Sequence, residues 1–388
     1  MIAGLTAVDS WRKRVRPAQA SFPRIEPAEM AVGESLATVY AYGTVLYDDM
    51  LAAIEGAQHR VLFESFIVKG DEVGVRFKQA LIDAAERGVE VFVIYDGFAN
   101  LVVRRSFFKF PASVQVLRYP ALRLGMLLFD LRKSGRDHRK LLVVDGDVGF
   151  VGGYNIGSAY ATQWRDTHLR VSGASAWDLE NVFVDFWNEH CGERQQRLPE
   201  LGSTEWDPTL RVHRNVPSQL IYPIRGMYLE AIDRARESIS ITQPYFIPDR
   251  EMVKALLGAA RRGVEVRVLV PETSNHVVAD WLSRGFYTTL LRGGVQLWLY
   301  EDAMVHAKTM TIDGRWSTVG TANIDRLSLT GNYEVNVELF DRGLAEHLEA
   351  VFATDLTNAR QLPLAEWSAR STAAKLIEGL LAPLRPLL

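Results

Sequence analysis

Two stretches of this 388-residue sequence repeat one set of polar residues at one spacing. Each copy holds a His-x-Lys triplet, an Asp five residues beyond the Lys, a Gly seven residues further on and an Asn three residues after that. The copies are His138, Lys140, Asp145, Gly152 and Asn155, and then His306, Lys308, Asp313, Gly320 and Asn323. Asp166 and Glu334 extend the match, because each follows its histidine at the same distance along the chain (166 − 138 = 334 − 306). A constant difference in numbering (306 − 138 = 168) therefore relates two complete sets.

These residue types suit nucleophilic displacement at a phosphodiester. The reaction needs a nucleophile, an acid for the leaving alkoxide and fixed positive charge around the non-bridging oxygens. One imidazole must be neutral to attack phosphorus, and the other must be protonated to donate. The two lysines and two asparagines can donate hydrogen bonds to the phosphate oxygens, so no metal ion is implied. Asp166 and Glu334 can accept from the second nitrogen of each imidazole and fix its orientation.

The His-x-Lys spacing predicts that both side chains of each copy point the same way. Residues 141–144 and 309–312 are apolar or β-branched and end in Asp-Gly, which predicts two strands with a turn after each. In a strand, residues i and i+2 face the same side, so each His and its Lys enter one cleft. Asp145 and Asp313 follow the strands, where we expect structural roles in the turns. The glycines of the two sets are expected to permit close backbone packing beneath the site.

A second internal repeat describes the scaffold. Residues 80–95 and 255–270 are identical at 10 of 16 positions, again with a constant difference in numbering (255 − 80 = 175). Each copy predicts a helix that begins after an Asp and ends at a Gly, followed by a β-branched strand; these residues are Asp71, Gly88, Asp249 and Gly263. Strand-like runs at 60–68 and 238–247 precede the two helices. The order strand, helix, strand predicts an α/β fold made of two related halves.

The doubled pattern resembles the phospholipase D superfamily, whose members carry two copies of H-x-K-x4-D-x6-G with a following Asn. From about Val39 onward the chain is most similar to bacterial cardiolipin synthases, in the segments Asp71–Gly74, Val93–Gly97, Trp164–Arg170, Gln243–Pro248 and Leu380–Leu388. The resemblance implies two homologous α/β/α halves with pseudo-two-fold symmetry and one active site at their interface. It also implies a covalent phosphohistidine, with His138 as the nucleophile and His306 as the general acid. The two roles could be exchanged.

Repeat and resemblance together divide the chain into four parts. We expect an N-terminal arm at 1–38, a first half at 39–200, a second half at 201–365 and a C-terminal amphipathic segment at 366–388. The N-terminal pair of membrane helices found in many cardiolipin synthases has no counterpart here, because no window of 18 or more apolar residues occurs. The first charges follow a very short apolar start, the reverse of a signal peptide. The sequence therefore predicts a peripheral protein on the cytoplasmic side of a membrane.

Composition excludes several classes of protein. With 48% hydrophobic and 23% charged residues, the chain has material for a sizeable core. Its net charge of −3 excludes a globally basic coat for nucleic acid. The single cysteine, Cys191, excludes a disulfide framework and a cysteine-based zinc site. The histidines without metal-ligand spacing are His59, His190, His213, His276 and His347. No metal ion or other cofactor is predicted.

Two further residues are candidates for substrate binding. His168 lies near the first set of polar residues, and Tyr245 precedes the helix of the second half. For Tyr245 a place in the aromatic core is an equal alternative.

One segment departs from the overall charge balance. Residues 101–140 hold ten Lys or Arg against two Asp, a local charge of +8. Interleaved Phe, Leu and Met residues make the segment amphipathic, which favours anionic phospholipid over nucleic acid as its partner. The alternative is a basic solvated loop packed on its own core. The run at 373–388 is either a second lipid-facing element or a cap on the second half.

The function predicted from these features is that of a cardiolipin synthase-type phosphatidyltransferase. A phosphatidyl group would pass through phosphohistidine from one phosphatidylglycerol to another, with release of glycerol. The same machinery could instead hydrolyse phospholipid or, less in keeping with the apolar side chains of the basic segment, nucleic acid. A non-catalytic lipid-binding scaffold is disfavoured because neither set of polar residues is degraded. The acceptor and the oligomeric state are not determined by the sequence.

Overall fold

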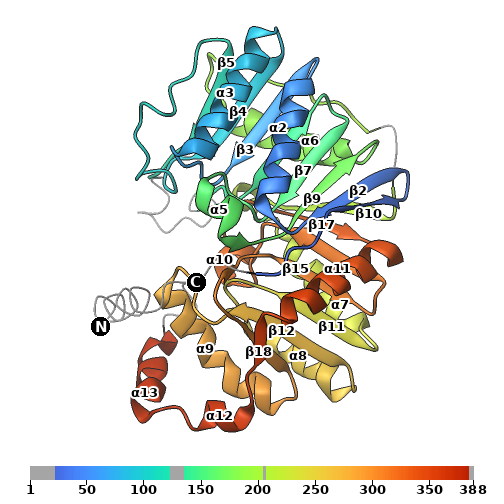
Figure 1. Cartoon of the computed structure of the whole chain (residues 1–388), viewed down its shortest axis with the longest axis vertical. Coiled ribbons are helices and arrows are strands. Elements are labelled where there is room, and N and C mark those ends of the chain that lie inside the picture. Colours follow the sequence, from blue (N-terminus) through green and yellow to red (C-terminus); the bar gives the residue numbers. More distant parts are fainter. Residues whose placement is uncertain (1–21, 123–134, 204–206, 384–388) are drawn as a thin grey trace.

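The computed structural model describes residues 22–122, 135–203 and 207–383, which fold into two α/β halves stacked along the long axis of the molecule (Figure 1). Each half is built on a mixed sheet of eight strands with helices on both faces. The predicted fold class, two related halves of α/β/α type, is confirmed.

The first half begins with a β-hairpin and ends with a long helix. Its elements are β1 (Ala28–Val32), β2 (Ser35–Tyr40), α2 (Gly43–Gly56), β3 (Arg60–Ser65), α3 (Glu72–Glu86), β4 (Glu90–Asp96), β5 (Val114–Tyr119), β6 (Lys140–Val144), β7 (Val148–Gly152), α5 (Ser158–Thr162), β8 (Trp164–Arg165), β9 (His168–Ser172) and α6 (Ala176–His190). The strand order is β1-β2-β9-β7-β6-β3-β4-β5. Strands β3, β4 and β5 are parallel, and β6 runs antiparallel to β3 with Lys140 opposite Ser65.

The second half repeats this plan. Its elements are β10 (Leu210–Asn215), a 3-10 turn (Pro217–Gln219), α7 (Pro223–Arg234), β11 (Ser238–Thr242), α8 (Arg250–Arg261), β12 (Glu265–Pro271), α9 (Val277–Arg292), β13 (Gln296–Tyr300), β14 (Met304–Val305), β15 (Thr309–Ile312), β16 (Trp316–Gly320), α10 (Arg326–Thr330), β17 (Glu334–Leu339), α11 (Arg342–Leu356), β18 (Ala359–Gln361), α12 (Leu364–Ser368) and α13 (Thr372–Leu381). The strand order is β10-β17-β16-β15-β11-β12-β13-β18. Strands β11, β12 and β13 are parallel, and β15 is antiparallel to β11.

Local signals in the sequence fix the repeated helices. Asp71 caps α3 by accepting from the backbone N–H of Gly74 at 3.1 Å, and Asp249 caps α8 in the same way. Gly88 and Gly263 follow these helices with φ of 94° and 91°, a conformation that costs residues with a side chain more than glycine. The predicted strand-helix-strand units therefore form as the sequence indicates.

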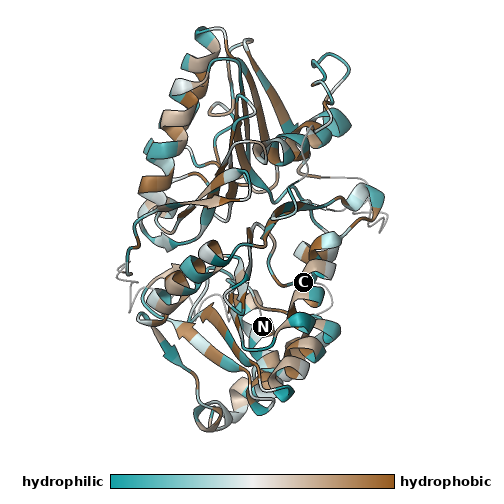
Figure 2. Cartoon of the chain, turned by 90° about the vertical axis from the view of Figure 1, so that its right-hand side faces the viewer, coloured by the Kyte–Doolittle hydropathy of each residue, from teal (hydrophilic) through white to brown (hydrophobic). Residues whose placement is uncertain are grey.

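The two halves share a core. One buried cluster joins Leu169 and Val171 of β9 with Val335 and Val337 of β17, and α6 and α11 both contribute to it. Helix α6 of the first half also contacts β10 of the second, and α11 contacts β1. In Figure 2 the apolar strands of both sheets lie between helices whose outer faces are polar. The apolar surface of each sheet is thus covered partly by the other half.

Part of the predicted arm belongs to the first sheet. Residues 28–38, assigned to the arm from the sequence, form β1 and most of β2 at the edge of the first sheet. Every residue of β2 except Leu36 is buried, and the strand pairs with β9, which draws the segment into the sheet. The C-terminal segment is helical over Thr372–Leu381. No helix among the described residues is long and apolar enough to cross a membrane.

Candidate active site

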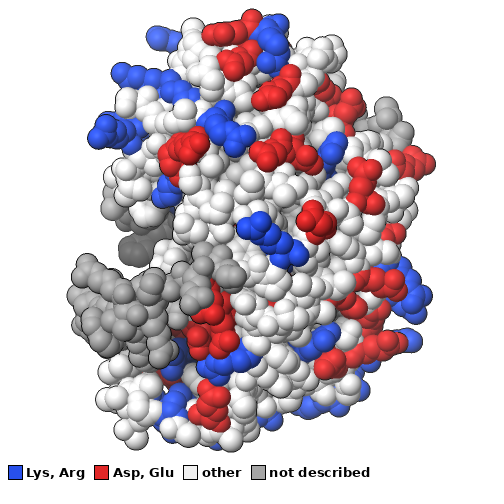
Figure 3. Space-filling model, in the orientation of Figure 1, with Lys and Arg blue, Asp and Glu red and all other residues white. Residues whose placement is uncertain are grey.

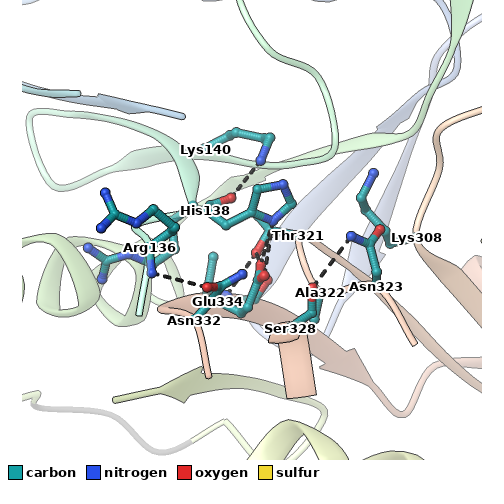
Figure 4. A network of polar contacts seen from close by, with 12 residues as sticks. Arg136, His138, Lys140, Lys308, Thr321, Ala322, Asn323, Ser328, Asn332 and Glu334 are labelled. Carbon is teal, nitrogen blue, oxygen red and sulfur yellow. Dashed lines mark hydrogen bonds and ion pairs between the residues drawn. The ribbon is translucent and has the colours of Figure 1, made fainter. Parts of the chain in front are cut away.

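The two His-x-Lys triplets lie where β6 and β15 begin, at the edge of each sheet that faces the other half. Lys140 is the first residue of β6, and Lys308 directly precedes β15. Figure 4 shows His138 and Lys140 on a strand of the first half, beside Glu334 and Lys308 from the second half. The predicted strands after each triplet are present, so each His and its Lys share one face of an extended segment.

Each histidine is held by the carboxylate of the opposite half. His138 Nδ1 lies 3.0 Å from both carboxylate oxygens of Glu334, and His306 Nδ1 lies 2.6 Å from Oδ2 of Asp166. A backbone hydrogen bond also joins the two halves at this point: the N–H of His138 donates to the carbonyl oxygen of Tyr333 at 3.1 Å. The spacing in the sequence matches each histidine to a carboxylate of its own copy. The structure pairs it with the other copy, so neither half holds a complete site.

The carboxylates are themselves fixed by hydrogen bonds. Thr321 Oγ1 donates to Glu334 at 2.6 Å, and the backbone N–H of Thr167 donates to Asp166 at 2.8 Å. Gly153 occupies the position that corresponds to Thr321, and a Cβ atom there would lie 2.0 Å from Asp166 Oδ1. A side-chain hydroxyl group therefore fixes Glu334, whereas a backbone N–H fixes Asp166.

The lysines and asparagines of the two sets are buried and have different hydrogen-bond partners. Lys140 Nζ donates to the carbonyl oxygen of His138 at 2.5 Å. Lys308 Nζ lies 2.9 Å from Nδ1 and 3.1 Å from Nε2 of the His306 ring. Asn323 donates to Ser328 Oγ at 3.4 Å, and its buried Oδ1 has no hydrogen-bond partner among the described residues. Asn155 instead accepts from the N–H of Ile67 at 3.1 Å.

Burial determines the charge of the imidazoles. Desolvation lowers the pKa of His138, although the nearby charge of Glu334 opposes this effect. Desolvation and the charge of Lys308 lower the pKa of His306 further, to about 3. Lys308 also lowers the pKa of His138, and Lys140 lowers that of His306. Both rings are therefore neutral at pH 7, and a lysine of the other half lowers the pKa of each.

Burial and neighbouring charges also shift the pKa values of the lysines and carboxyl groups of the site. Burial lowers the pKa of Lys140 to about 8 and that of Lys308 to about 7. Although burial favours the neutral acid, Lys308 and His306 hold the pKa of Asp166 below its usual value. Burial raises the pKa of Asp325 to about 7. A bound phosphate anion would raise the pKa of both lysines and return them to full charge.

The motif aspartates lie away from the cleft, in turns at the far ends of the strands. Asp145 accepts from the backbone N–H groups of three consecutive residues, Gln58, His59 and Arg60, each at 2.8 Å. Asp313 accepts from Arg236, Glu237 and Ser238 at 2.8 to 2.9 Å. Both have φ of 54°, a left-handed conformation that Asp tolerates, and the glycine that follows each also has positive φ, as a tight turn requires. This geometry gives them a structural part in joining β6 to β3 and β15 to β11.

Glycine is required at two positions beneath the site. A Cβ atom on Gly152 would lie 2.5 Å from the carbonyl of Thr167, and one on Gly320 would lie 2.5 Å from that of Val335. Thr167 and Val335 directly follow Asp166 and Glu334 in the sequence. Close approach of β7 to β9 and of β16 to β17 brings the carboxylates to their positions.

The two substrate-binding candidates have different surroundings. His168 is 1% exposed, neither ring nitrogen has a hydrogen-bond partner among the described residues, and burial lowers its pKa to about 3. Tyr245 lies beside His306, with ring centroids 6.2 Å apart, and its hydroxyl group donates to Asn275 at 2.5 Å. Tyr245 therefore lies next to a histidine of the site, whereas His168 is enclosed in the protein interior.

Several residues of the site have no signal in the repeat pattern. The ring of Phe66 lies 4.7 Å from that of His138, and the ring of Trp164 lies 5.0 Å from that of His306. Thr321 and Asp325 correspond to glycines in the first copy, so comparing the copies does not single them out. No group of three His, Cys, Asp or Glu side chains in the described part of the chain could hold a metal ion.

Two segments, residues 50–187 and 228–356, match the protein-family model described as "Cardiolipin synthase, PLD-like domain". The chain belongs to this phospholipase D-like family. It is therefore an enzyme of the phospholipase D superfamily. The matched segments contain both His-x-Lys triplets and both carboxylates, so the family relationship covers the whole site.

Curated relatives extend the similarity over most of the chain. The protein called "Cardiolipin synthase 1" in Bacillus anthracis is 30% identical over 364 residues, which cover 89% of this chain and 71% of the relative. A protein called "Cardiolipin synthase" in Staphylococcus aureus is 32% identical over 364 residues, with 90% and 73% covered.

Solved structures are similar in fold. A phosphatidylserine synthase of Haemophilus influenzae superposes with a TM-score of 0.67 at 15% identity and covers 97% of each chain. A polyphosphate kinase of Porphyromonas gingivalis superposes with a TM-score of 0.57 at 13% identity, over 94% of this chain and 57% of that one. These two similarities concern the fold alone.

Proposed function

We propose that this enzyme is a cardiolipin synthase-type phosphatidyltransferase that moves a phosphatidyl group from one phosphatidylglycerol to another and releases glycerol. The observation that carries the proposal is the pairing of His138 with Glu334 and of His306 with Asp166, each across the interface between the two halves. Two oriented imidazoles in one lysine-lined cleft suit a reaction with a covalent intermediate. The names of the relatives supply the substrate class.

The first step forms phosphohistidine. His138 Nε2 attacks phosphorus while Glu334 accepts a hydrogen bond from Nδ1 and holds the ring. The phosphorus–oxygen bond to glycerol breaks, and His306 gives a proton to the leaving alkoxide. Lys140 and Lys308 stabilise the charge that develops on the phosphate oxygens. The bound anion raises the pKa of both imidazoles, which allows His306 to be protonated although its pKa in the empty site is about 3.

The second step reverses the first with a new alcohol. His306 takes the proton from the hydroxyl group of a second phosphatidylglycerol, and the resulting oxygen displaces His138 from phosphorus. Asn155 and Asn323 are proposed as further donors near the phosphate, and Tyr245 as a contact of the headgroup. One observation favours the exchanged assignment, because the lower pKa of His306 also suits a neutral nucleophile.

We also propose peripheral contact with an anionic membrane near the mouth of the site. The segment between β4 and β5 leaves the sheet at the edge where Lys140 lies. It exposes apolar side chains together with basic ones: Phe98, Leu101 and Val102 are 53% to 83% exposed, and Arg104, Arg105 and Lys109 are also exposed. Figure 3 shows Lys and Arg gathered at the upper left, over this segment. Such a surface suits anionic lipid.

Part of the predicted membrane segment has a different role. Phe107, Phe108 and Phe110 are half-buried against the core of the first half, and Phe108 stacks on Tyr95 at 4.0 Å. Residues 123–134, which hold Arg123, Arg132 and Lys133 and much of the apolar sequence, lie outside the described residues. The cytoplasmic side of the membrane stays a prediction from the sequence.

Intact-protein mass spectrometry tests the chemistry. After exposure to an activated phosphatidyl ester, whose leaving group needs no proton, His306→Ala is expected to keep an adduct because nothing deprotonates the acceptor. His138→Ala is expected to form none. His59→Ala is the matched control, because His59 is exposed at the far turn beside Asp145. An adduct on His138→Ala but not on His306→Ala would reverse the assignment, and full turnover in either variant would end the two-histidine mechanism.

Lipid analysis tests the acceptor. Vesicles of labelled phosphatidylglycerol are expected to yield cardiolipin and glycerol in equal amounts. Phosphatidic acid as the main product would identify water as the acceptor and make the enzyme a hydrolase.

A further inference from the structure

Two buried arginines lie behind the site, one beside each histidine–carboxylate pair. Arg139 stands between His138 and Lys140 in the sequence, and Arg165 directly precedes Asp166. They are 2% and 1% exposed. Because alternate residues of an extended chain face opposite sides, both guanidinium groups point away from the cleft. Neither belongs to the repeated set of polar residues.

Arg139 anchors the segment that carries His138. Its Nε donates to Asp137 at 3.1 Å and its Nη1 to the carbonyl of Val182 in α6 at 3.2 Å, while Nη2 pairs with Glu64 of β3. The guanidinium also lies 5.8 Å from the ring of Tyr333, the neighbour of Glu334. Arg139 thus ties the segment of His138 to β3 and α6, and its guanidinium lies near the residue that precedes Glu334.

Arg165 anchors the strand that carries Asp166. Its Nε and Nη2 donate to the two carboxylate oxygens of Asp355 at 2.8 and 2.7 Å, a bidentate pair between β8 of the first half and α11 of the second. Its Nη1 donates to Thr167 Oγ1 at 3.0 Å and also binds the carbonyl of Asp166. The backbone carbonyl of Arg165 accepts from the N–H of His306 at 2.6 Å. One residue therefore contacts both members of the second pair.

The two arrangements are not copies of each other. When the two copies are aligned on their histidines, Arg139 corresponds to Ala307 and Arg165 to Tyr333. Behind His138 the arginine comes from the histidine strand, and behind His306 it comes from the carboxylate strand. The duplication therefore did not carry one arginine to both places, and each half-site has its own anchor.

We propose that Arg139 and Arg165 are positioning residues, each of which fixes one histidine–carboxylate pair independently of the other. A planar fork with several donors sets direction as well as charge, which a lysine in the same place does not do. A buried ion pair contributes little net stability compared with apolar residues of the same size. The main contribution of these groups is therefore to the geometry of the site. The inference rests on the proposed function only for its effect on rate.

Nuclear magnetic resonance of ¹⁵N-labelled histidine tests the proposal without any turnover. The signals of His138 and His306 are identified by their loss in His→Gln variants. Arg165→Met/Asp355→Leu removes one ion pair as a whole and is expected to shift the resonances and the pKa of His306 but not those of His138. Arg139→Met/Glu64→Gln is expected to shift the resonances and the pKa of His138 but not those of His306. Arg60→Met, which removes the half-buried pair with Glu180, should shift neither.

Activity provides a second measurement. Each double variant is expected to keep its circular dichroism spectrum and to lose about 10²-fold in kcat, because small displacements of reacting groups have that effect. Arg165→Lys keeps the positive charge but not the forked guanidinium. Its kcat is expected to stay below a tenth of that of the unchanged enzyme. Full rescue by lysine, unchanged resonances, or equal shifts of both histidines in both variants would each overturn the proposal. If the resonances respond as expected in a protein that transfers no phosphatidyl group, the proposed function fails and the positioning role stands.

Discussion

Single residues of the site owe their charge state to burial and to neighbours from both halves. His138 is affected by Glu334 and Lys308, and His306 by Asp166 and Lys140, although none of these neighbours belongs to the same half as its histidine. Burial and the charge of Lys308 lower the pKa of His306 to about 3, so two imidazoles of equal chemistry differ in pKa. Such a difference is what an acid and a nucleophile in one reaction need.

The lysines predict the alkaline side of the pH profile. Their pKa values of about 8 for Lys140 and about 7 for Lys308 are those of the empty site, so each loses its charge as the pH rises through that value. We expect kcat/KM to fall as the pH rises through about 7 to 8. The fall in kcat should come at higher pH, since a bound anion raises both pKa values. In Lys308→Arg the charge persists, and the fall should move to the value for Lys140; an identical profile would contradict this reading.

Loss of either lysine should slow the chemical step. Lys140→Ala and Lys308→Ala are each expected to lower kcat by about 10²-fold or more, because fixed positive charge stabilises the transition state. Single-turnover measurement with an activated ester checks this. Lys254→Ala, on an exposed face of α8, is the control and should leave kcat unchanged. A change confined to KM would indicate that the lysines act only in binding.

At the scale of elements, short strands deliver the reactive groups and exposed segments surround them. Strands β6 and β15 each begin at a triplet and end at a turn held by an aspartate, Asp145 or Asp313. Helix α13 packs Ile377 and Leu381 against α9 and leaves Leu376 and Leu380 more than half exposed. The packing of Ile377 and Leu381 agrees with a cap on the second half, and contact of Leu376 and Leu380 with lipid stays a prediction.

The exposed segment between β4 and β5 predicts a lipid preference. Sedimentation with phosphatidylglycerol vesicles should decrease as salt rises, and phosphatidylcholine vesicles should bind less. Leu101→Ser/Val102→Ser is expected to weaken binding about tenfold or more, since each large apolar side chain contributes about 1.5–3 kcal/mol when buried. Phe340→Ser is the matched control, because Phe340 is exposed beyond the end of β17 opposite to Glu334. An equal loss of vesicle binding in both variants would show that the segment between β4 and β5 is not the membrane-binding surface.

At the scale of the whole molecule, the two halves share one buried cluster and the candidate site. Leu169 and Val337 pack in the same cluster, although they lie on different sheets. The buried pair of Arg165 and Asp355 and the parallel pairing of β8 with β14 also cross the seam. The halves are related by sequence, and each supplies part of the shared cluster and of the site, so we expect them to depend on each other in folding.

This dependence predicts a single unfolding transition. Calorimetry should give one peak for the full chain, with equal calorimetric and van't Hoff enthalpies. Leu169→Ala, in the shared cluster, should lower the free energy of unfolding by about 2–5 kcal/mol and move the whole peak to lower temperature. Leu36→Ala is the control, because Leu36 is 43% exposed in β2. Two separate peaks, with only one moved by the substitution, would show that the halves unfold independently.

The sequence by itself determined the repeat, the local elements and the candidate chemical groups. Asp71 and Gly88 mark the ends of a helix through local hydrogen bonds and backbone preference, and the His-x-Lys spacing follows from strand alternation. Only the tertiary structure decided which carboxylate serves which histidine, because Glu334 and Asp166 reach their partners from the opposite half of the chain. Arg139 and Arg165 have no periodic signal for the same reason. Their partners are set by how the two halves pack, which no local pattern encodes.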